Sequence, residues 1–111
     1  MYQILIAEDE VKIAAFIEKG FKKQGFATAV AEDGPQALLM ATESEFDLLL
    51  LDLGLPAIDG MTVLRERRHR GEQRPIIVVM PRTDQQELLS ALESGASEYV
   101  TKPFSCSDLL L

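Results

Sequence analysis

The chain has 111 residues, of which 47% are hydrophobic and 26% are charged, and its net charge is −7 with a pI of about 4.6. This composition is ordinary for one soluble globular domain and excludes a chain too polar to build a core. The acidic balance argues against broad binding to a nucleic-acid backbone, which needs a basic surface.

Compartment and cofactor signals are few. The single cysteine, Cys106, cannot form an internal disulfide, and no Cys or His spacing indicates zinc. The apolar run Ile4–Ala7 is too short for a signal peptide, and no stretch reaches the roughly 18 apolar residues of a membrane span. We therefore expect a cytoplasmic protein with no membrane partner, and a solvated helix end at His69.

The first third of the chain alternates between strand and helix patterns. Gln3–Ala7 is an apolar run that predicts a buried strand. A helix follows, in which Gly25 is the expected stop and the apolar residues at helical spacing are Ile13, Phe16, Ile17 and Phe21. The apolar side of this helix is expected to face the core.

The middle of the chain repeats the alternation. Ala27–Ala31 predicts a short second strand, and Gly34-Pro35 opens a second helix with proline in its first turn. Leu48–Asp52 predicts a third strand that ends in a carboxylate, and Gly60 to about His69 predicts a third helix. Asp59-Gly60 has the character of a turn and helix cap rather than of a chemical group.

The last third predicts two more strands and parts of two helices. Pro75–Met80 is apolar and β-branched, as in a buried strand. Thr83 to Gln86 resembles a capping box for a fourth helix, with Thr83 as its cap, which Gly95 ends. Glu98–Thr101 predicts a short fifth strand, and Ser105–Asp108 is a further helix start.

Strands without polar alternation, separated by helices, predict an α/β doubly wound fold with a parallel sheet of five strands covered on both faces. Such sheets place their sites at the carboxyl ends of the strands. Four predicted strands end in chemically distinctive residues: Glu8-Asp9, Asp52, Met80-Pro81 and Lys102. The sequence therefore predicts one site at this edge of the sheet.

Together these segments resemble the receiver domain of bacterial two-component response regulators. The resemblance covers 3–110 and is carried by residues 4–10 (ILIAEDE), 52–56 (DLGLP), 59–60 (DG), 102–104 (KPF) and 93–96 (ESGA), which precede Tyr99. Each motif is weak alone, but in this order and spacing they are specific. The family implies a flavodoxin-like sheet with strand order 2-1-3-4-5.

In that family an aspartate accepts a phosphoryl group from a partner histidine kinase, and the matching residue is Asp52. A carboxylate nucleophile needs its own charge and the donor's charge offset. Magnesium suits a site of oxygen ligands and few carboxylates. The resemblance implies that Asp9 and Asp52 ligate Mg²⁺ directly, Glu8 through water and Gly54 through its carbonyl. Lys102 then contacts the phosphoryl oxygens.

Simpler explanations exist for each residue taken alone. Glu8-Asp9 could cap the first helix, since acids favour helix N-termini. Asp52 could be a turn residue at a strand end, and Lys102 could be a surface lysine. The joint arrangement of these residues favours the site.

One position departs from the family pattern. The family has Ser or Thr at the end of the fourth strand, where this chain has Met80, which cannot donate a hydrogen bond. Pro81 follows where a small residue is usual. The aromatic residue that turns inward with that hydroxyl in the family corresponds to Tyr99. The switch formed by Met80 and Tyr99 is therefore in doubt.

Two hypotheses follow, and we favour the first because Glu8, Asp9, Asp52 and Lys102 are all present. Asp52 is phosphorylated but weakly coupled to the fourth helix, or the domain acts independently of phosphorylation. An Mg²⁺-dependent aspartyl phosphatase is a weaker alternative, because it needs an acid at position 54, which is Gly54. A flavin-binding module would need Ser, Thr or Gly where Glu8-Asp9-Glu10 stands.

The chain ends at Leu109-Leu110-Leu111, one turn into the fifth helix. We expect residues 1–111 to be a receiver domain cut inside that helix, with an output domain absent. The ending at 102–105 most resembles regulators with a C-terminal winged-helix DNA-binding domain, so DNA would be bound only through that part. Homodimerisation, or self-association through uncovered apolar surface, is also expected.

Overall fold

The computed structural model describes residues 1–81 and 84–102. Strands and helices alternate along the chain in the order β1 (Gln3–Ala7), α1 (Val11–Lys23), β2 (Ala27–Ala31), α2 (Gly34–Glu43), β3 (Leu48–Asp52), α3 (Gly60–His69), β4 (Ile76–Met80), α4 (Gln85–Glu93) and β5 (Glu98–Thr101). The predicted alternation is confirmed. The predicted start of a fifth helix, Ser105 to Asp108, lies outside the described residues.

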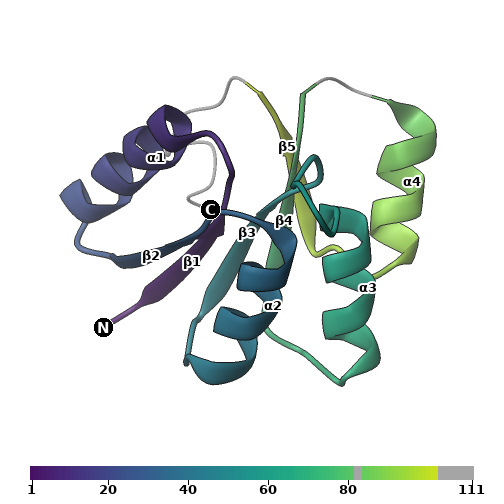
Figure 1. The fold of residues 1–111 in the computed structure, drawn as a ribbon, viewed down its shortest axis with the longest axis horizontal. Helices are drawn as coiled ribbons and strands as arrows, with labels where there is room; N and C mark the ends of the chain where they lie inside the picture. The colour runs from purple at the N-terminus through teal and green to yellow at the C-terminus, as the bar shows by residue number, and fades with distance from the viewer. Residues whose placement is uncertain (82–83, 103–111) are drawn as a thin grey trace.

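The strands form one parallel sheet in the order β2-β1-β3-β4-β5 (Figure 1). The fold class and strand order are as predicted. Because every strand runs the same way, all five carboxyl ends lie along one edge. β1, β3 and β4 occupy the middle of the sheet, so the segments that follow them converge at the centre of that edge.

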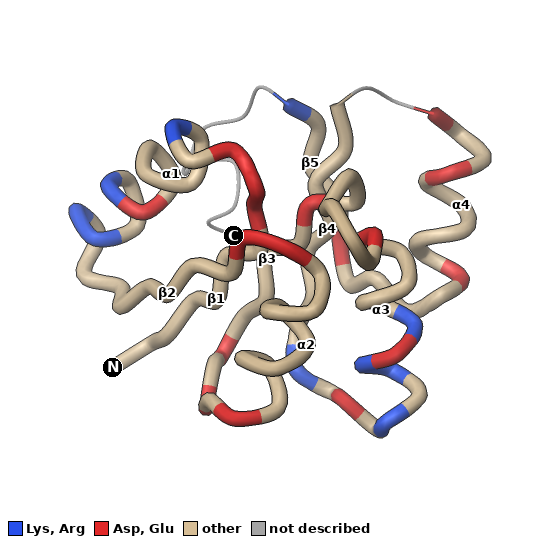
Figure 2. The backbone as a smooth tube through the Cα atoms, viewed as in Figure 1, with Lys and Arg blue, Asp and Glu red and all other residues tan. Residues whose placement is uncertain are grey.

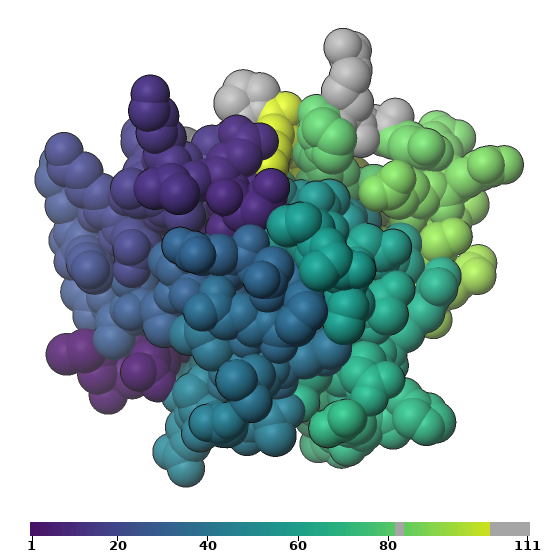
Figure 3. All heavy atoms as spheres, viewed as in Figure 1, coloured from purple at the N-terminus to yellow at the C-terminus, as the bar shows by residue number. Residues whose placement is uncertain are grey.

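The two faces of the sheet carry different apolar side chains, since successive residues of a strand point to opposite faces. Leu5, Leu49 and Leu51 belong to a core that α2, α3 and α4 cover. Ile4, Ile6 and their neighbours on β3 and β4 pack instead with Ile17 and Phe21 of α1. The space-filling view shows α2, α3 and α4 side by side on the first face (Figure 3).

The helix ends follow local capping chemistry. Gly25 and Gly95 adopt φ of +91° and +110° just beyond α1 and α4, a conformation that L side chains rarely adopt. Asp33 and Asp59 accept hydrogen bonds from backbone N–H groups in the first turns of α2 and α3. Among the described residues, every helix is too short or too polar to cross a bilayer.

Two local predictions were wrong. The cap of α4 is Asp84 rather than Thr83: its carboxylate accepts from the N–H groups of Gln86 and Glu87, because a carboxylate one residue later reaches two free N–H groups. Phe16 does not face the core, since its exposed fraction is 63%, and Ala14 is buried in the stripe instead. The strand β4 begins at Ile76, one residue after its predicted start.

Candidate functional site

Asp52 closes the central strand β3 and is 5% exposed. The four leucines before it are buried, so the strand carries this carboxylate to the edge of the core. Its Oδ1 accepts a hydrogen bond from the Gly54 N–H at 2.9 Å. The side chain is therefore held at the strand end, with its second oxygen turned to other partners.

Two acids from the end of β1 lie beside it. Glu8 directly follows the strand and is 2% exposed, and its Oε2 accepts from the Glu10 N–H at 3.2 Å. Asp9 is exposed. Carboxylate oxygens of Glu8, Asp9 and Asp52 all lie within 4.8 Å of one another. α1 begins after Glu10 with no side-chain cap, so the explanation of Glu8-Asp9 as its cap fails.

Lys102 reaches this group from the end of β5. Its backbone N–H donates to the Met80 carbonyl at 2.8 Å, which continues the pairing of β4 and β5. Its Nζ lies 3.0 Å from Asp52 Oδ2 and 3.0 Å from Glu8 Oε1. The ammonium thus bridges the two buried carboxylates, and the lysine is not a free surface residue.

The charges in this pocket do not balance. Burial, together with the neighbouring Asp52, raises the pKa of Glu8 from 4.5 to about 7, although contacts with Lys102 and Glu10 pull it down. Burial by itself would lower the pKa of Lys102, but hydrogen bonds to Asp52 and Glu8 outweigh it and raise that pKa. One ammonium is too little for three crowded carboxylates.

These residues fit a magnesium ion. The donors are carboxylate oxygens on three residues, and Mg²⁺ prefers a few carboxylates completed by water and phosphate. The raised pKa of Glu8 is what a site built for additional positive charge would show before the ion binds. Gly54 is held by its N–H to Asp52, and the ligation by its carbonyl stays a prediction.

Two glycines shape the loop that follows Asp52. A Cβ on Gly60 would collide with the Asp52 carbonyl oxygen, and a Cβ on Gly34 would collide with the Ile58 carbonyl oxygen. The starts of α3 and α2 can therefore pack directly on the loop that carries Gly54. From the sequence, Asp59-Gly60 was predicted only as a turn and a helix cap. The DG pair after a strand end was the available signal for this second role.

The fourth strand contributes no hydroxyl to the pocket. Met80 is 1% exposed and belongs to the core beneath α2, α3 and α4. Tyr99 is half-buried and packs against the same core, one strand away. The structure therefore places Met80 and Tyr99 together in apolar packing, and the switch role of Tyr99 stays a prediction.

Comparison with known sequences identifies the family. A family model described as "Response regulator receiver domain" matches residues 4–111. The chain belongs to this family. The receiver is a signalling module of two-component systems and not an enzyme, so the aspartyl phosphatase alternative is set aside. Receivers bind Mg²⁺ at an acidic site, for which Glu8, Asp9 and Asp52 are the candidates here.

Relatives of this receiver include named transcription regulators. It is 41% identical over 108 residues to the transcriptional activator protein IrlR of Burkholderia pseudomallei, covering 97% of this chain and 47% of that protein. It is 33% identical to the transcriptional regulatory protein PrrA of Mycobacterium tuberculosis, over 97% of this chain and 46% of PrrA. The chain thus spans about half the length of the curated relatives it matches.

Solved structures agree with this assignment. The receiver domain of the Francisella response regulator 1452 superposes with a TM-score of 0.94 at 33% identity, covering 99% of this chain and 91% of that one. The chemotaxis protein CheY4 of Vibrio cholerae, at 24% identity and a TM-score of 0.92, shares the fold.

Proposed function

We propose that this receiver accepts a phosphoryl group on Asp52 from a cognate histidine kinase. A carboxylate oxygen of Asp52 attacks phosphorus, a P–O bond forms, and the P–N bond to the donor imidazole breaks. The leaving imidazole then takes up a proton. The observation that carries the proposal is the Lys102 ammonium, which lies 3.0 Å from both Asp52 and Glu8 at the carboxyl edge of the sheet.

Each residue of the pocket has a task in this transfer. The Gly54 N–H fixes one oxygen of Asp52, so that the carboxylate keeps a single orientation. Lys102 offsets negative charge that would otherwise repel the incoming phosphoryl group, and it can follow the transferred oxygens. Mg²⁺, held by Asp9, Asp52 and Glu8, would neutralise the remaining carboxylate and phosphoryl charge.

A small phosphodonor tests the proposal without the kinase. The purified chain is incubated with Mg²⁺ and acetyl phosphate, and its intact mass is recorded. We expect a gain of one phosphoryl group that disappears in Asp52→Asn. The matched control is Asp59→Asn, which keeps the mass gain because asparagine also caps α3. A phosphorylated Asp52→Asn, or an unmodified native chain, would refute the proposal.

A second candidate function rests on Met80. The buried methionine offers no donor to a phosphoryl oxygen, so phosphorylation could leave α4 unchanged and the domain could act in one state. Met80→Thr restores a hydroxyl at this strand end. If the native chain is phosphorylated but its amide spectrum changes only in Met80→Thr, the phosphorylation-independent function is favoured. Equal changes in both proteins favour the first proposal.

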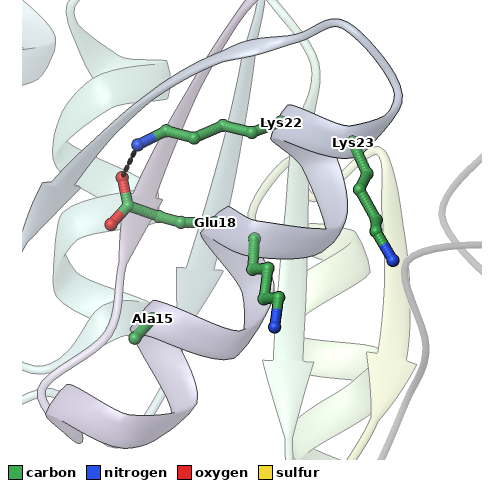
Figure 4. A pocket seen from close by; sticks show the side chains of 5 residues that line it. Ala15, Glu18, Lys22 and Lys23 are labelled. Carbon is green, nitrogen blue, oxygen red and sulfur yellow. Dashed lines mark ion pairs between the residues drawn. The ribbon is translucent and has the colours of Figure 1, made fainter.

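We place the kinase on α1, next to the acidic pocket. This helix starts at Val11, directly after Glu8-Asp9-Glu10, and exposes two apolar side chains, with Val11 72% and Phe16 63% exposed. Figure 4 shows the lysine-bearing side of the same helix, a shallow depression lined by Ala15, Glu18, Lys19, Lys22 and Lys23. A partner that brings phosphohistidine to Asp52 passes this helix, and the lysines suit acidic groups on it.

Phe16→Ala tests this docking surface. The side chain is mostly exposed, so we expect the stability of the fold to change little. Transfer from the kinase should fall roughly tenfold, as for loss of an apolar anchor, while labelling by acetyl phosphate stays unchanged. Leu39→Ala, which removes an exposed leucine from α2, is the matched control. Equal transfer rates in both variants would remove α1 from the kinase contact.

The proposed setting is a cytoplasmic transcription regulator. IrlR and PrrA are named as transcription regulators, and each is about twice as long as the segment they share with this chain. We infer that DNA is bound by an output domain outside residues 1–111, and that phosphorylation acts on it through α4, β5 and homodimer formation.

A further inference from the structure

The loop from β3 to α3 is held by the first residue of α2. The Pro56 carbonyl accepts two hydrogen bonds, from the Ile58 N–H at 2.8 Å and from the Gly34 N–H at 3.3 Å. Gly34 opens α2, and the first N–H groups of a helix have no partner inside it. The loop therefore supplies an acceptor that the start of α2 needs, and α2 gives the loop an anchor outside its own residues.

The two segments are in close backbone contact. Gly34 is buried, and a Cβ added to it would collide with the carbonyl oxygen and the Cβ of Ile58. The start of α2 is itself fixed by side chains. The Asp33 carboxylate accepts from the Gln36 N–H at 2.7 Å, and the Gln36 side chain accepts from the Glu32 N–H at 2.6 Å. The loop thus packs on a helix end whose own backbone is held in place.

Ala57, between Pro56 and Ile58, has a left-handed backbone. Its φ is +68°, a conformation that side chains other than glycine rarely adopt. The hydrogen bond from Ile58 to Pro56 closes a γ-turn around Ala57, and a γ-turn with positive φ is rare and strained. The Ala57 side chain is exposed, so burial of its methyl group does not offset the strain. Such a conformation persists where surrounding contacts impose it, and the contact with Gly34 is one of these.

The same loop orients the carboxylate at the centre of the pocket. Gly54, which precedes Ala57 in the loop, donates its N–H to Asp52 Oδ1 at 2.9 Å. Leu53 and Leu55, on either side of Gly54, are buried in the core. The backbone at Gly54 therefore has little freedom of its own, and its direction depends on where the end of the loop is held.

We propose that Gly34 and Ala57 are positioning residues for the metal side of the Asp52 pocket. The Gly34 N–H and the left-handed turn at Ala57 hold the loop in the shape in which the Gly54 N–H orients the Asp52 carboxylate for Mg²⁺. Both residues act through the loop and not by contact with the ion. Their role rests on the metal site of the proposed function, and it makes the start of α2 part of the support of that site.

The strain at Ala57 gives the loop a second state. When the contact with Gly34 opens, an alanine returns to negative φ, and the Gly54 N–H leaves Asp52. The turned state of the loop is the one that binds Mg²⁺ tightly, so the apparent Kd rises as the fraction of chains in that state falls. Residues at position 57 that tolerate positive φ less well should therefore weaken magnesium binding in a graded way.

Substitution of Ala57 tests this dependence at an exposed position. Ala57→Gly, the native chain and Ala57→Val form a series of decreasing tolerance for positive φ. In titration calorimetry with Mg²⁺, we expect a Kd about threefold lower for Ala57→Gly and about tenfold higher for Ala57→Val than for the native chain. Gly71→Ala is the matched control. Gly71 also has a positive φ, of +90°, but it follows α3 at the amino edge, so this variant should lose stability and keep the native Kd.

The amide of Gly54 provides a readout that needs no metal. Loss of its hydrogen bond to the carboxylate moves the amide proton resonance upfield. We expect an upfield shift in Ala57→Val and a larger one in Gly34→Ala, whose added Cβ collides with the loop. Gly71→Ala should leave the resonance in place. If Gly34→Ala fails to fold, the two variants at position 57 still decide.

Two results would overturn the positioning role. One is a Kd that stays constant across the position 57 series while stability changes, which would make the turn purely structural. The other is a Gly54 resonance that responds to neither site.

Failure of the proposed function gives different results. A native chain that binds no Mg²⁺ contradicts the metal part of that function, and the positioning role is then judged on the Gly54 resonance alone. A native chain that binds Mg²⁺ but gains no phosphoryl group from acetyl phosphate contradicts the transfer to Asp52. The Kd series then still decides whether Gly34 and Ala57 position the loop.

Discussion

The two edges of the sheet hold buried carboxylates in opposite electrostatic settings. At the carboxyl edge, the buried Glu8 and Asp52 share the Lys102 ammonium, the exposed Asp9 lies beside them, and the pKa of Glu8 rises to about 7. At the amino edge, one carboxylate, Glu72, lies between two guanidinium groups, and its pKa falls to about 2. Figure 2 shows acidic segments after β1 and basic segments at the end of α3.

The contacts of Glu72 explain its low pKa. Arg74 lowers it most, with Nη2 2.7 Å from Oε1 and Nε 2.8 Å from Oε2, and Arg67 adds a bond of 2.9 Å. Arg74 also lies 3.7 Å over the ring of Phe46 and donates to its carbonyl. We call Glu72, Arg67 and Arg74 the Glu72 cluster.

The difference teaches how to tell a structural charge from a functional one. In the Glu72 cluster both guanidinium groups pair with the Glu72 carboxylate, although the buried Arg67 Nε has no hydrogen-bond partner among the described residues, and the cluster fixes the connections around α3 and β4. The Asp52 pocket keeps negative charge without enough positive partners, which costs stability unless a cation binds there. We therefore expect that removal of the Glu72 charge at the amino edge lowers the free energy of unfolding. Removal of the Glu8 charge at the carboxyl edge should raise it.

The largest effect is expected at Glu72. Glu72→Gln leaves Arg67 and Arg74 without their counter-charge, and we expect the free energy of unfolding to fall by about 3 kcal/mol. Glu66→Gln, which loses only an exposed pair with Arg70, should cost at most about 0.5 kcal/mol. Urea unfolding followed by circular dichroism measures both. A Glu72 variant as stable as the Glu66 variant would contradict the comparison.

The stability of the fold in acid should also depend on Glu72. The pKa of Glu72 is below its unfolded value of 4.5, so its stabilising contribution is present above about pH 4.5 and is lost as pH falls toward about 2. The native chain should therefore lose more stability over this range than Glu72→Gln does. Parallel curves for the two proteins would show that Glu72 is not the responsible group.

The next effect is at Glu8 and has the opposite sign. Its folded pKa of about 7 exceeds 4.5, so without Mg²⁺ its contribution is full below about pH 4.5 and is lost as pH rises through about 7. Glu8→Gln stays neutral and should be more stable than the native chain at about pH 8, by on the order of 2 kcal/mol. Urea midpoints across pH measure this.

Magnesium is the matched control for that comparison. Added Mg²⁺ should raise the stability of the native chain at about pH 8 more than that of Glu8→Gln, because a ligand of the folded state stabilises in proportion to its binding. A native chain whose stability does not fall between about pH 4.5 and about pH 7 would mean that the pocket is already balanced.

The smallest effect separates geometry from charge within the Glu72 cluster. Arg74→Lys keeps the charge but loses the paired donors and the stacking on Phe46, so we expect a loss of about 1 kcal/mol. Arg70→Lys, on the exposed end of α3, should change stability by less than about 0.5 kcal/mol. The midpoints of thermal unfolding of the two variants measure this difference. Equal midpoints would mean that charge alone stabilises the Glu72 cluster.

The residues that lie at the carboxyl edge of the sheet could be predicted from the sequence, for a physical reason. Apolar runs indicate most of the strands, and parallel strands bring their ends together. Glu8, Asp52 and Lys102 each stand at the carboxyl end of a predicted strand. The sequence pattern therefore predicts that these three side chains lie close together at the carboxyl edge of the sheet. The bridging of two carboxylates by Lys102 needed the structure, since spacing along the chain gives no side-chain direction.

The amino edge could not be predicted in the same way. Arg67, Glu72 and Arg74 are spaced like ordinary charges on a helix end and in a loop, and nothing local shows that Arg67 is 7% exposed. Arg74 meets Phe46 across 28 residues. The predicted orientation of Phe16 was wrong for a related reason. An apolar residue at the border of the apolar stripe of a helix can face either the core or the solvent.

Site mapping tests the central claim most directly. After incubation with Mg²⁺ and acetyl phosphate, the chain is reduced with borohydride, which converts an aspartyl phosphate to homoserine, and its peptides are sequenced by mass spectrometry. The account predicts homoserine at position 52, with none at positions 9 and 59. Homoserine at another aspartate, or none in a folded chain with Mg²⁺ present, would contradict it.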